Sequence, residues 1–238
     1  MERTLSSYTS VGSRAAALSA VQTRVINQVY LWMMLGLALT AATAFFVAST
    51  DSVKQVIFGN QILFWGLIIA ELGLVFVISG LIERLSAAAA TGLFFLYSAL
   101  NGLTLASIFL VYNLGSIAGV FLITAGTFGV MSLYGITTKT DLTRIGNLLF
   151  MALIGIVIAG LVNIFIGSSI LSLILSVIGV MVFTGLTAYD AQRIKEMSAA
   201  ALDGESEGKI AVLGALSLYL NFINLFLSLL RLFGSREE

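Results

Sequence analysis

Residues 169–190 read SILSLILSVIGVMVFTGLTAYD, and no charged side chain occurs between Ser169 and Tyr189. A helix needs about 20 apolar residues to cross the ~30 Å hydrocarbon core of a bilayer. The stretch therefore has the length and composition of a transmembrane helix that ends at the acid Asp190. Residues 87–111 form a second uncharged run of the same kind.

The rest of the chain repeats this pattern, with short polar breaks between long apolar stretches. These stretches show no alternation of polar and apolar residues, which the ~10-residue strands of a membrane β-barrel would require. We therefore expect an all-α polytopic membrane protein, a bundle of seven transmembrane helices. The predicted spans are 28–49, 61–82, 87–111, 116–136, 147–167, 169–190 and 210–232.

The composition agrees with a membrane protein and excludes several functional classes. Hydrophobic residues make up 59% of the 238 residues and charged residues 10%, whereas soluble domains have about 45–50% and about 25%. His and Cys are absent, which excludes Ser–His–Asp catalysis, thiol chemistry and imidazole- or thiolate-bound metals. The net charge is zero, so nothing favours nucleic acid as a partner. We expect no enzyme activity and no cofactor.

The distribution of Lys and Arg predicts the orientation, because cytoplasmic loops carry an excess of these residues. Nine lie in the N-terminal segment and in the connections on its side of the membrane, and three lie on the opposite side. The N-terminus is therefore predicted in the cytoplasm and the C-terminus outside. The three residues of the opposite side are Lys54, Arg231 and Arg236.

The predicted organisation is a cytoplasmic N-terminal tail over residues 1–27, a membrane domain over 28–233 and a short C-terminal tail over 234–238. The first 27 residues are rich in Ser and Thr and lack the apolar core of a signal peptide. Leu18, Val21 and Val25 have helical spacing. A short interfacial helix and a partly disordered tail both remain open for this segment.

Ionisable residues inside the predicted spans are rare and are by default candidates for function. Glu71 lies midway along the second span, and Asp190 ends the sixth. For Glu71 the alternative is a hydrogen bond to a neighbouring helix that serves packing alone. For Asp190 the alternative is an interfacial ion pair with Arg193 or Arg84.

Polar side chains form a stripe on one face of the seventh span. Ser217, Asn221, Asn224 and Ser228 follow the i, i+4, i+7, i+11 spacing of a helix. Amides cannot face lipid without unsatisfied hydrogen-bonding groups, so this face is predicted to point into the bundle. A matching stripe of Tyr97, Asn101 and Thr104 on the third span is interpreted as hydrogen bonding between helices. For the seventh span, the lining of a buried polar path is an equal alternative.

Three stretches resemble the Bax inhibitor-1 family of small seven-helix membrane proteins. They are residues 135–142 (GITTKTDL), 184–192 (TGLTAYDAQ) and 215–226 (ALSLYLNFINLF), and the similarity covers about residues 28–233. The resemblance implies a bundle in which the last helix is central and six helices surround it in two layers of three. It also implies a protein of the bacterial inner membrane.

The resemblance implies a pH-sensitive leak of calcium that depends on two aspartates, one ending the sixth helix and one in the seventh. Asp190 matches the first, but Asn221 stands at the second position, where many members of the family have Asp. Two close carboxylates titrate as a coupled unit, which an Asp–Asn pair cannot do. Asn221 can instead donate a hydrogen bond to Asp190. Calcium prefers carboxylate oxygens, so Asp190 alone makes a weakened calcium site.

The resemblance further matches Glu71 to a buried acid of the family on its second helix, and Arg84, by position only, to a cationic latch for Asp190. With Asn224, these residues form the predicted ion pathway and pH sensor. Two functions remain open: a channel or sensor for calcium or other cations, and a non-conducting regulator of a membrane-bound AAA protease that is reached by the N-terminal tail. The replacement of Asp by Asn221 favours the second.

Overall fold

The computed structural model describes residues 2–201 and 203–236, with side chains from Leu18 onward. Seven of its helices are long and apolar enough to cross a membrane, so the predicted all-α, seven-span architecture is confirmed. The helices are α1 (Glu2–Ser49), α2 (Asp51–Phe58), α3 (Gln61–Gly80), α4 (Ala87–Leu105), α5 (Leu114–Thr137), α6 (Thr143–Ile166), α7 (Ser169–Ala199) and α8 (Gly204–Phe233), with short 3₁₀ helices η1 (Ile82–Arg84) and η2 (Ala106–Leu110).

Capping side chains explain why most helices begin where they do. The first N–H groups of a helix have no partner in the helix, and a side-chain oxygen just before it can accept from one of them. Five helices use an Asn, Ser or Asp in this way: the caps are Asn60, Ser86, Asn113, Ser168 and Asp203. At the end of α6, Gly167 adopts a left-handed conformation, with φ of 67°, that stops the helix.

Three helices, α1, α7 and α8, extend further than the sequence predicted. The backbone of α1 is one helix from Glu2 to Ser49, so no break separates residues 2–27 from the first span. The predicted break over residues 191–209 is too long, because α7 continues to Ala199 and α8 begins at Gly204. Charged residues led to the prediction of a loop there, but they occupy the helix ends near the membrane surface, where charge is tolerated.

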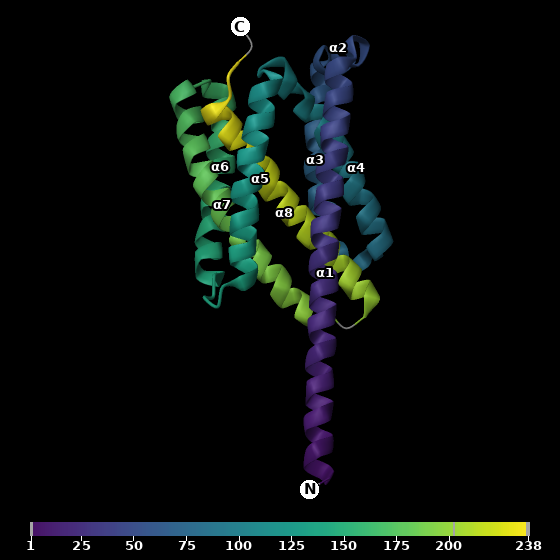
Figure 1. The fold of residues 1–238 in the computed structure, drawn as a ribbon. Helices are drawn as coiled ribbons and strands as arrows, with labels where there is room; N and C mark the ends of the chain where they lie inside the picture. The colour runs from purple at the N-terminus through teal and green to yellow at the C-terminus, as the bar shows by residue number, and fades with distance from the viewer. Residues whose placement is uncertain (1, 202, 237–238) are drawn as a thin grey trace.

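The last helix is the centre of the bundle. Figure 1 shows α8 crossing the molecule diagonally, with α1, α3 and α4 on one side and α5, α6 and α7 on the other. It packs on α7, α1, α5 and α4, and it buries residues along most of its length. In contrast, α6 packs mainly on α7 and leaves nearly all of its side chains at the periphery. The arrangement implied by the family resemblance is therefore confirmed.

The odd number of spans places the two termini at opposite ends of the bundle (Figure 1). We call the end that carries η1, the α5–α6 connection and the α7–α8 connection the N-terminal face. The opposite end, which carries α2, η2, the α6–α7 connection and the C-terminal segment, is the C-terminal face.

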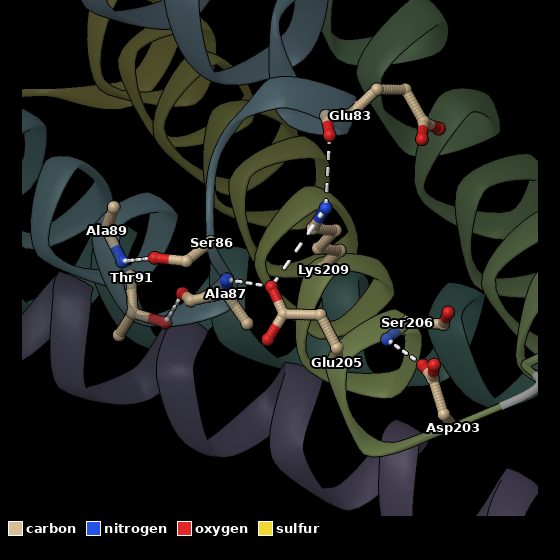
Figure 2. Close-up of polar contacts among 9 residues, drawn as sticks. All are labelled: Glu83, Ser86, Ala87, Ala89, Thr91, Asp203, Glu205, Ser206 and Lys209. Atoms are coloured by element: carbon tan, nitrogen blue, oxygen red, sulfur yellow. Dashed lines mark hydrogen bonds and ion pairs between the residues drawn. The ribbon is translucent and has the colours of Figure 1, made fainter.

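Polar contacts tie the beginning of α8 to the α3–α4 connection on the N-terminal face (Figure 2). The Glu205 carboxylate accepts a hydrogen bond of 2.7 Å from the backbone N–H of Ala87, the first residue of α4. Lys209 donates to the backbone carbonyl of Glu83 at 3.2 Å. Both contacts satisfy backbone groups that the helix ends leave open, so they fix the central helix at this face.

Candidate functional site

Asp190 and Asn221 meet at the contact between α7 and α8. The side-chain amide of Asn221 donates a hydrogen bond of 2.7 Å to Oδ2 of Asp190. Asp190 is half-buried, and Asn221 is buried. The donation that the sequence predicted from Asn221 to Asp190 is thus present in the structure.

A cavity of about 530 Å³ surrounds this pair. It lies between α6, α7 and α8, and the first turns of α6 place it toward the N-terminal face. Asp190 precedes the end of α7 by nine residues, which corresponds to about 14 Å along a helix axis. The polar residues of the lining are Asn147, Tyr189, Asp190, Arg193, Ser217, Asn221 and Asn224.

The predicted stripe on the last helix faces this cavity over most of its length. Ser217, Asn221 and Asn224 line it, and Asn224 also donates to the carbonyl oxygen of Leu220 at 2.8 Å. Ser228 lies beyond the cavity, buried against α7, where a Cβ on Gly179 would lie 2.6 Å from its hydroxyl oxygen. Three residues of the stripe therefore form the wall of a polar cavity, and the fourth packs between helices.

Apolar side chains close the cavity toward the C-terminal face. Phe183 and Leu186 belong both to the lining and to a buried cluster that continues with Phe226 and Leu229 of α8. This cluster lies between the cavity and the C-terminal face. The structure therefore holds a polar cavity that reaches part of the way through the bundle and is closed at its inner end.

Of the two arginines that the sequence offered as partners of Asp190, only Arg193 lines the cavity. Arg193 lies one turn after Asp190 on α7 and lines the cavity. Arg84 is exposed in η1 and is not part of the lining. Among the described residues, no ion pair joins Asp190 to a Lys or Arg. The structure therefore does not support the positional match of Arg84 to a latch, because Arg84 in the α3–α4 connection neither lines the cavity nor pairs with Asp190.

The first two recognised motifs pack against each other, which the sequence did not predict. A Cβ at Gly135 of α5 would overlap the carbonyl oxygen of Ala188 on α7, so only glycine permits this close approach. Gln192 bonds the α5–α6 connection twice, accepting from the N–H of Leu142 and donating to the carbonyl of Thr140, both at 2.8 Å. These contacts hold the turn of α7 that carries Asp190.

Lys195 continues this contact one turn later. Its ammonium donates to the carbonyl of Ile136 at 2.7 Å, which satisfies a carbonyl near the end of α5. Gly146 of α6 has a similar role, since a Cβ there would overlap the ring of Tyr189. Gly135 and Gln192 belong to the recognised motifs, whereas Gly146 and Lys195 lie a few residues beyond them.

Glu71 lies in a separate buried network. Its two carboxyl oxygens accept hydrogen bonds from the amide of Asn101 at 3.0 Å and the hydroxyl of Thr104 at 2.9 Å. The oxygen of the Asn101 amide accepts from the hydroxyl of Tyr219 at 3.0 Å, and this hydroxyl also contacts Thr40 at 2.6 Å. The network joins α3, α4, α8 and α1, and none of its members lines the cavity around Asp190. The interpretation of Asn101 as a hydrogen-bonding link between helices agrees with these contacts.

The acids of the described chain do not gather into a metal site. Within the described residues there is no group of three or more His, Cys, Asp or Glu side chains that could bind a metal ion. Asp190 is the one carboxylate in the lining of its cavity. Together with the amide oxygens of Asn221 and Asn224, it offers oxygen ligands of low total charge, which a hard cation binds weakly.

Comparison with known proteins agrees with this architecture. The model of the family described as "Inhibitor of apoptosis-promoting Bax1" matches residues 22–238. The inner membrane protein YbhL of Escherichia coli K12 is 56% identical over 212 residues, which cover 88% of this chain and 91% of that protein. An uncharacterized protein of Borreliella burgdorferi is 48% identical over 219 residues, 92% of this chain and 94% of that protein. An uncharacterized membrane protein of Streptococcus pyogenes is 40% identical over 212 residues.

The family match covers all seven spans, and the relatives at high identity are matched over nearly their whole length. The chain is therefore a multi-pass protein of the cell membrane, and it belongs to the Bax inhibitor-1 family.

Proposed function

We propose that the protein is a cation leak channel or cation sensor of the cell membrane, with Asp190 and Asn221 at its gate. One observation carries this proposal: the hydrogen bond of 2.7 Å between these residues lies in a polar cavity that stops inside the bundle. Carboxylate and amide oxygens can replace the water of a partly dehydrated cation. An intramembrane acid that faces a cavity is also the usual mark of an ion pathway.

The apolar cluster of Phe183, Leu186, Phe226 and Leu229 explains why such a path is closed in this arrangement. An apolar constriction blocks ions because it does not hold water. Opening requires α7 and α8 to separate at this level, which also breaks or lengthens the bond between Asp190 and Asn221. A cation bound in the cavity, or a change in the charge of Asp190, would therefore affect whether the apolar cluster between α7 and α8 stays closed.

The orientation belongs to this proposal. With seven spans, nine of the twelve Lys and Arg residues fall on the N-terminal face and three on the C-terminal face. The positive-inside rule then places the N-terminal face, and the cavity that lies toward it, in the cytoplasm. Calcium and protons of the cytoplasm would reach Asp190 from this side.

The test is calcium flux into liposomes that contain the purified protein, measured over a series of pH values. Asp190→Asn should remove the pH dependence, because no carboxylate remains in the lining of the cavity. Asn221→Asp should change the shape of the pH response, because two adjacent carboxylates titrate as a coupled pair. Glu196→Gln is the matched control, since Glu196 is an exposed acid of the same helix outside the cavity.

Two results of the liposome experiment would contradict the proposal. If Asn221→Asp leaves the pH profile unchanged while Asp190→Asn removes it, the two positions are not coupled. If the parent and every variant pass no calcium, the protein is not a channel under these conditions, and the second candidate takes its place.

The second candidate is a regulator of membrane-protein quality control that acts on a membrane-bound AAA protease. The observation that favours it is α1, which extends beyond the bundle in Figure 1. The α1 helix begins at Glu2, whereas the first span is predicted from residue 28, so several helical turns of α1 precede the predicted span. Deletion of residues 2–16 should abolish any effect of the protein on the turnover of a membrane-protease substrate in cells, and it should leave liposome flux unchanged.

A further inference from the structure

A second cavity opens on the C-terminal face, at the opposite end of the bundle from Asp190. Its volume is about 490 Å³, and it lies between the start of α7, the end of α8 and the connection before α5. Two arginines, Arg231 and Arg236, share its lining with Tyr112, Ser169, Ile170 and Leu173. The residues proposed for the ion path contribute nothing to it.

The short segment after α8 is attached firmly, and this fixes Arg236 at the cavity. Arg236 forms a β-bridge with Tyr112. The carbonyl of Ser235 accepts from the backbone N–H and the side-chain amide of Asn113 at 3.2 and 3.3 Å. The N–H of Ser235 donates to the hydroxyl of Ser116 at 2.8 Å. The chain therefore brings Arg236 back to the cavity that Arg231 already lines.

Neither arginine of this cavity has an ion-pair partner among the described residues. Only three basic residues lie on the C-terminal face, and one of them, Lys54, pairs with Asp51 at 2.7 Å. The other two both line the cavity, and no described acid forms an ion pair with either. Two guanidinium groups in one cavity repel each other unless an anion lies between them. The planar guanidinium fits two oxygens of a phosphate with paired hydrogen bonds.

The apolar part of the lining indicates what carries that phosphate. Ile170 and Leu173 of α7 are 71% and 55% exposed, on a helix that spans the membrane. A ligand that meets both parts of the site has an anionic head and an apolar tail. The hydroxyl groups of Ser169 and Tyr112 add hydrogen-bond partners at the level of the head.

We propose that this cavity binds the phosphodiester headgroup of an anionic phospholipid, with Arg231 and Arg236 on the phosphate and Ile170 and Leu173 against an acyl chain. Inorganic phosphate shares the headgroup chemistry, and the experiment separates the two sources. The proposal is independent of whether the protein conducts ions.

The experiment is native mass spectrometry of the full-length protein released from detergent micelles, with added phosphatidylglycerol, phosphatidylcholine or inorganic phosphate. We expect phosphatidylglycerol to remain bound in preference to phosphatidylcholine. Arg231→Gln/Arg236→Gln should lower the retained phosphatidylglycerol by more than about tenfold, because the loss of one charge-assisted hydrogen bond alone corresponds to about that factor and two arginines are removed. Lys139→Gln/Arg144→Gln removes the same charge from exposed positions of the opposite face and should retain the lipid like the parent.

Three results would overturn the proposal. The first is equal retention of phosphatidylglycerol by the parent and the arginine double variant. The second is an equal loss in the Lys139/Arg144 control, which would show a general effect of charge. The third is displacement of the lipid by millimolar phosphate together with direct phosphate binding, which would make free phosphate the ligand. Arg236→Gln alone leaves every residue of α8 unchanged and should give an intermediate loss, so a folding defect of the double variant cannot decide the result.

Discussion

The network around Glu71 allows a quantitative test of how the helices are held together. In Glu71→Leu, both acceptors of the carboxyl group are lost. Thr104 can then direct its proton to the carbonyl of Asn101, which lies 3.1 Å from its hydroxyl oxygen. The amide nitrogen of Asn101 has no such second partner among the described residues, because its one hydrogen bond, of 3.0 Å, is to Glu71. One buried donor is therefore left unsatisfied.

The expected loss follows from this count. An unsatisfied buried polar group costs about 1–3 kcal/mol, whereas a hydrogen bond between membrane helices contributes ~0.6 kcal/mol on average. Glu71→Leu should therefore lower the free energy of unfolding by about 1–3 kcal/mol. In Glu71→Gln, the new amide oxygen accepts from Asn101 and the new amide nitrogen donates to Thr104, whose proton moves to the Asn101 carbonyl. All partners remain satisfied, so this variant should lose less than about 0.6 kcal/mol.

The assay is reversible unfolding by SDS in mixed micelles, followed by the fluorescence of Trp32 and Trp65. The control is the exposed Glu83, where the Leu and Gln variants should agree within about 0.5 kcal/mol. If Glu71→Gln is as destabilising as Glu71→Leu, the carboxylate is needed for its charge, and the hydrogen-bond argument is wrong.

Further predictions concern helix packing, capping and orientation. Gly135→Ala should lower the free energy of unfolding by about 1–3 kcal/mol, because the added Cβ overlaps the backbone carbonyl of Ala188 and both backbones are held in helices. Gly155→Ala is the control: its Cβ would meet no atom within 4 Å, so it should be nearly neutral in the same SDS titration. The N–H and hydroxyl of Ser206 hold the pKa of Asp203 below its usual range. The stabilisation from Asp203 is thus complete above the ordinary aspartate pKa and is lost as the pH falls through the lowered value. Asp203→Asn keeps a capping oxygen and should show a smaller loss of stability in acid. If the loss in acid is unchanged, other acidic residues cause it. Reporters fused to the N-terminus and inserted at Asp203 should be cytoplasmic and a C-terminal reporter external, and a cytoplasmic C-terminal reporter would contradict the proposed orientation.

The candidate site shows where prediction from sequence ends. Asp190 and Asn221 could be placed on a sixth and a seventh helix, and the pair could be expected from the family resemblance. Helical spacing gave the direction of the stripe from Ser217 to Ser228, because amides cannot face lipid. It could not separate the three residues that line the cavity from Ser228, which packs against α7. That difference depends on how closely two helices approach at each level.

The choice of cation depended on tertiary structure for the same reason. Arg84 and Arg193 were both compatible with Asp190 in sequence. The position of Arg193 one turn along the same rigid helix brings it into the cavity, while the path of the α3–α4 connection keeps Arg84 out of it. Distances between helices that are not neighbours in sequence do not follow from periodicity.

The sequence by itself determined the fold class, the number of spans and most of the breaks between them, because the cost of burying charge and unpaired backbone in lipid acts on each segment separately. Only the tertiary structure decided four other features. They are the extent of α7 and α8, the contact of Gly135 with Ala188, the network from Glu71 to Thr40, and the presence of Arg231 and Arg236 in one cavity. Each of these depends on the packing of segments far apart in the chain, where a few tenths of an ångström decide whether a side chain fits or a hydrogen bond forms.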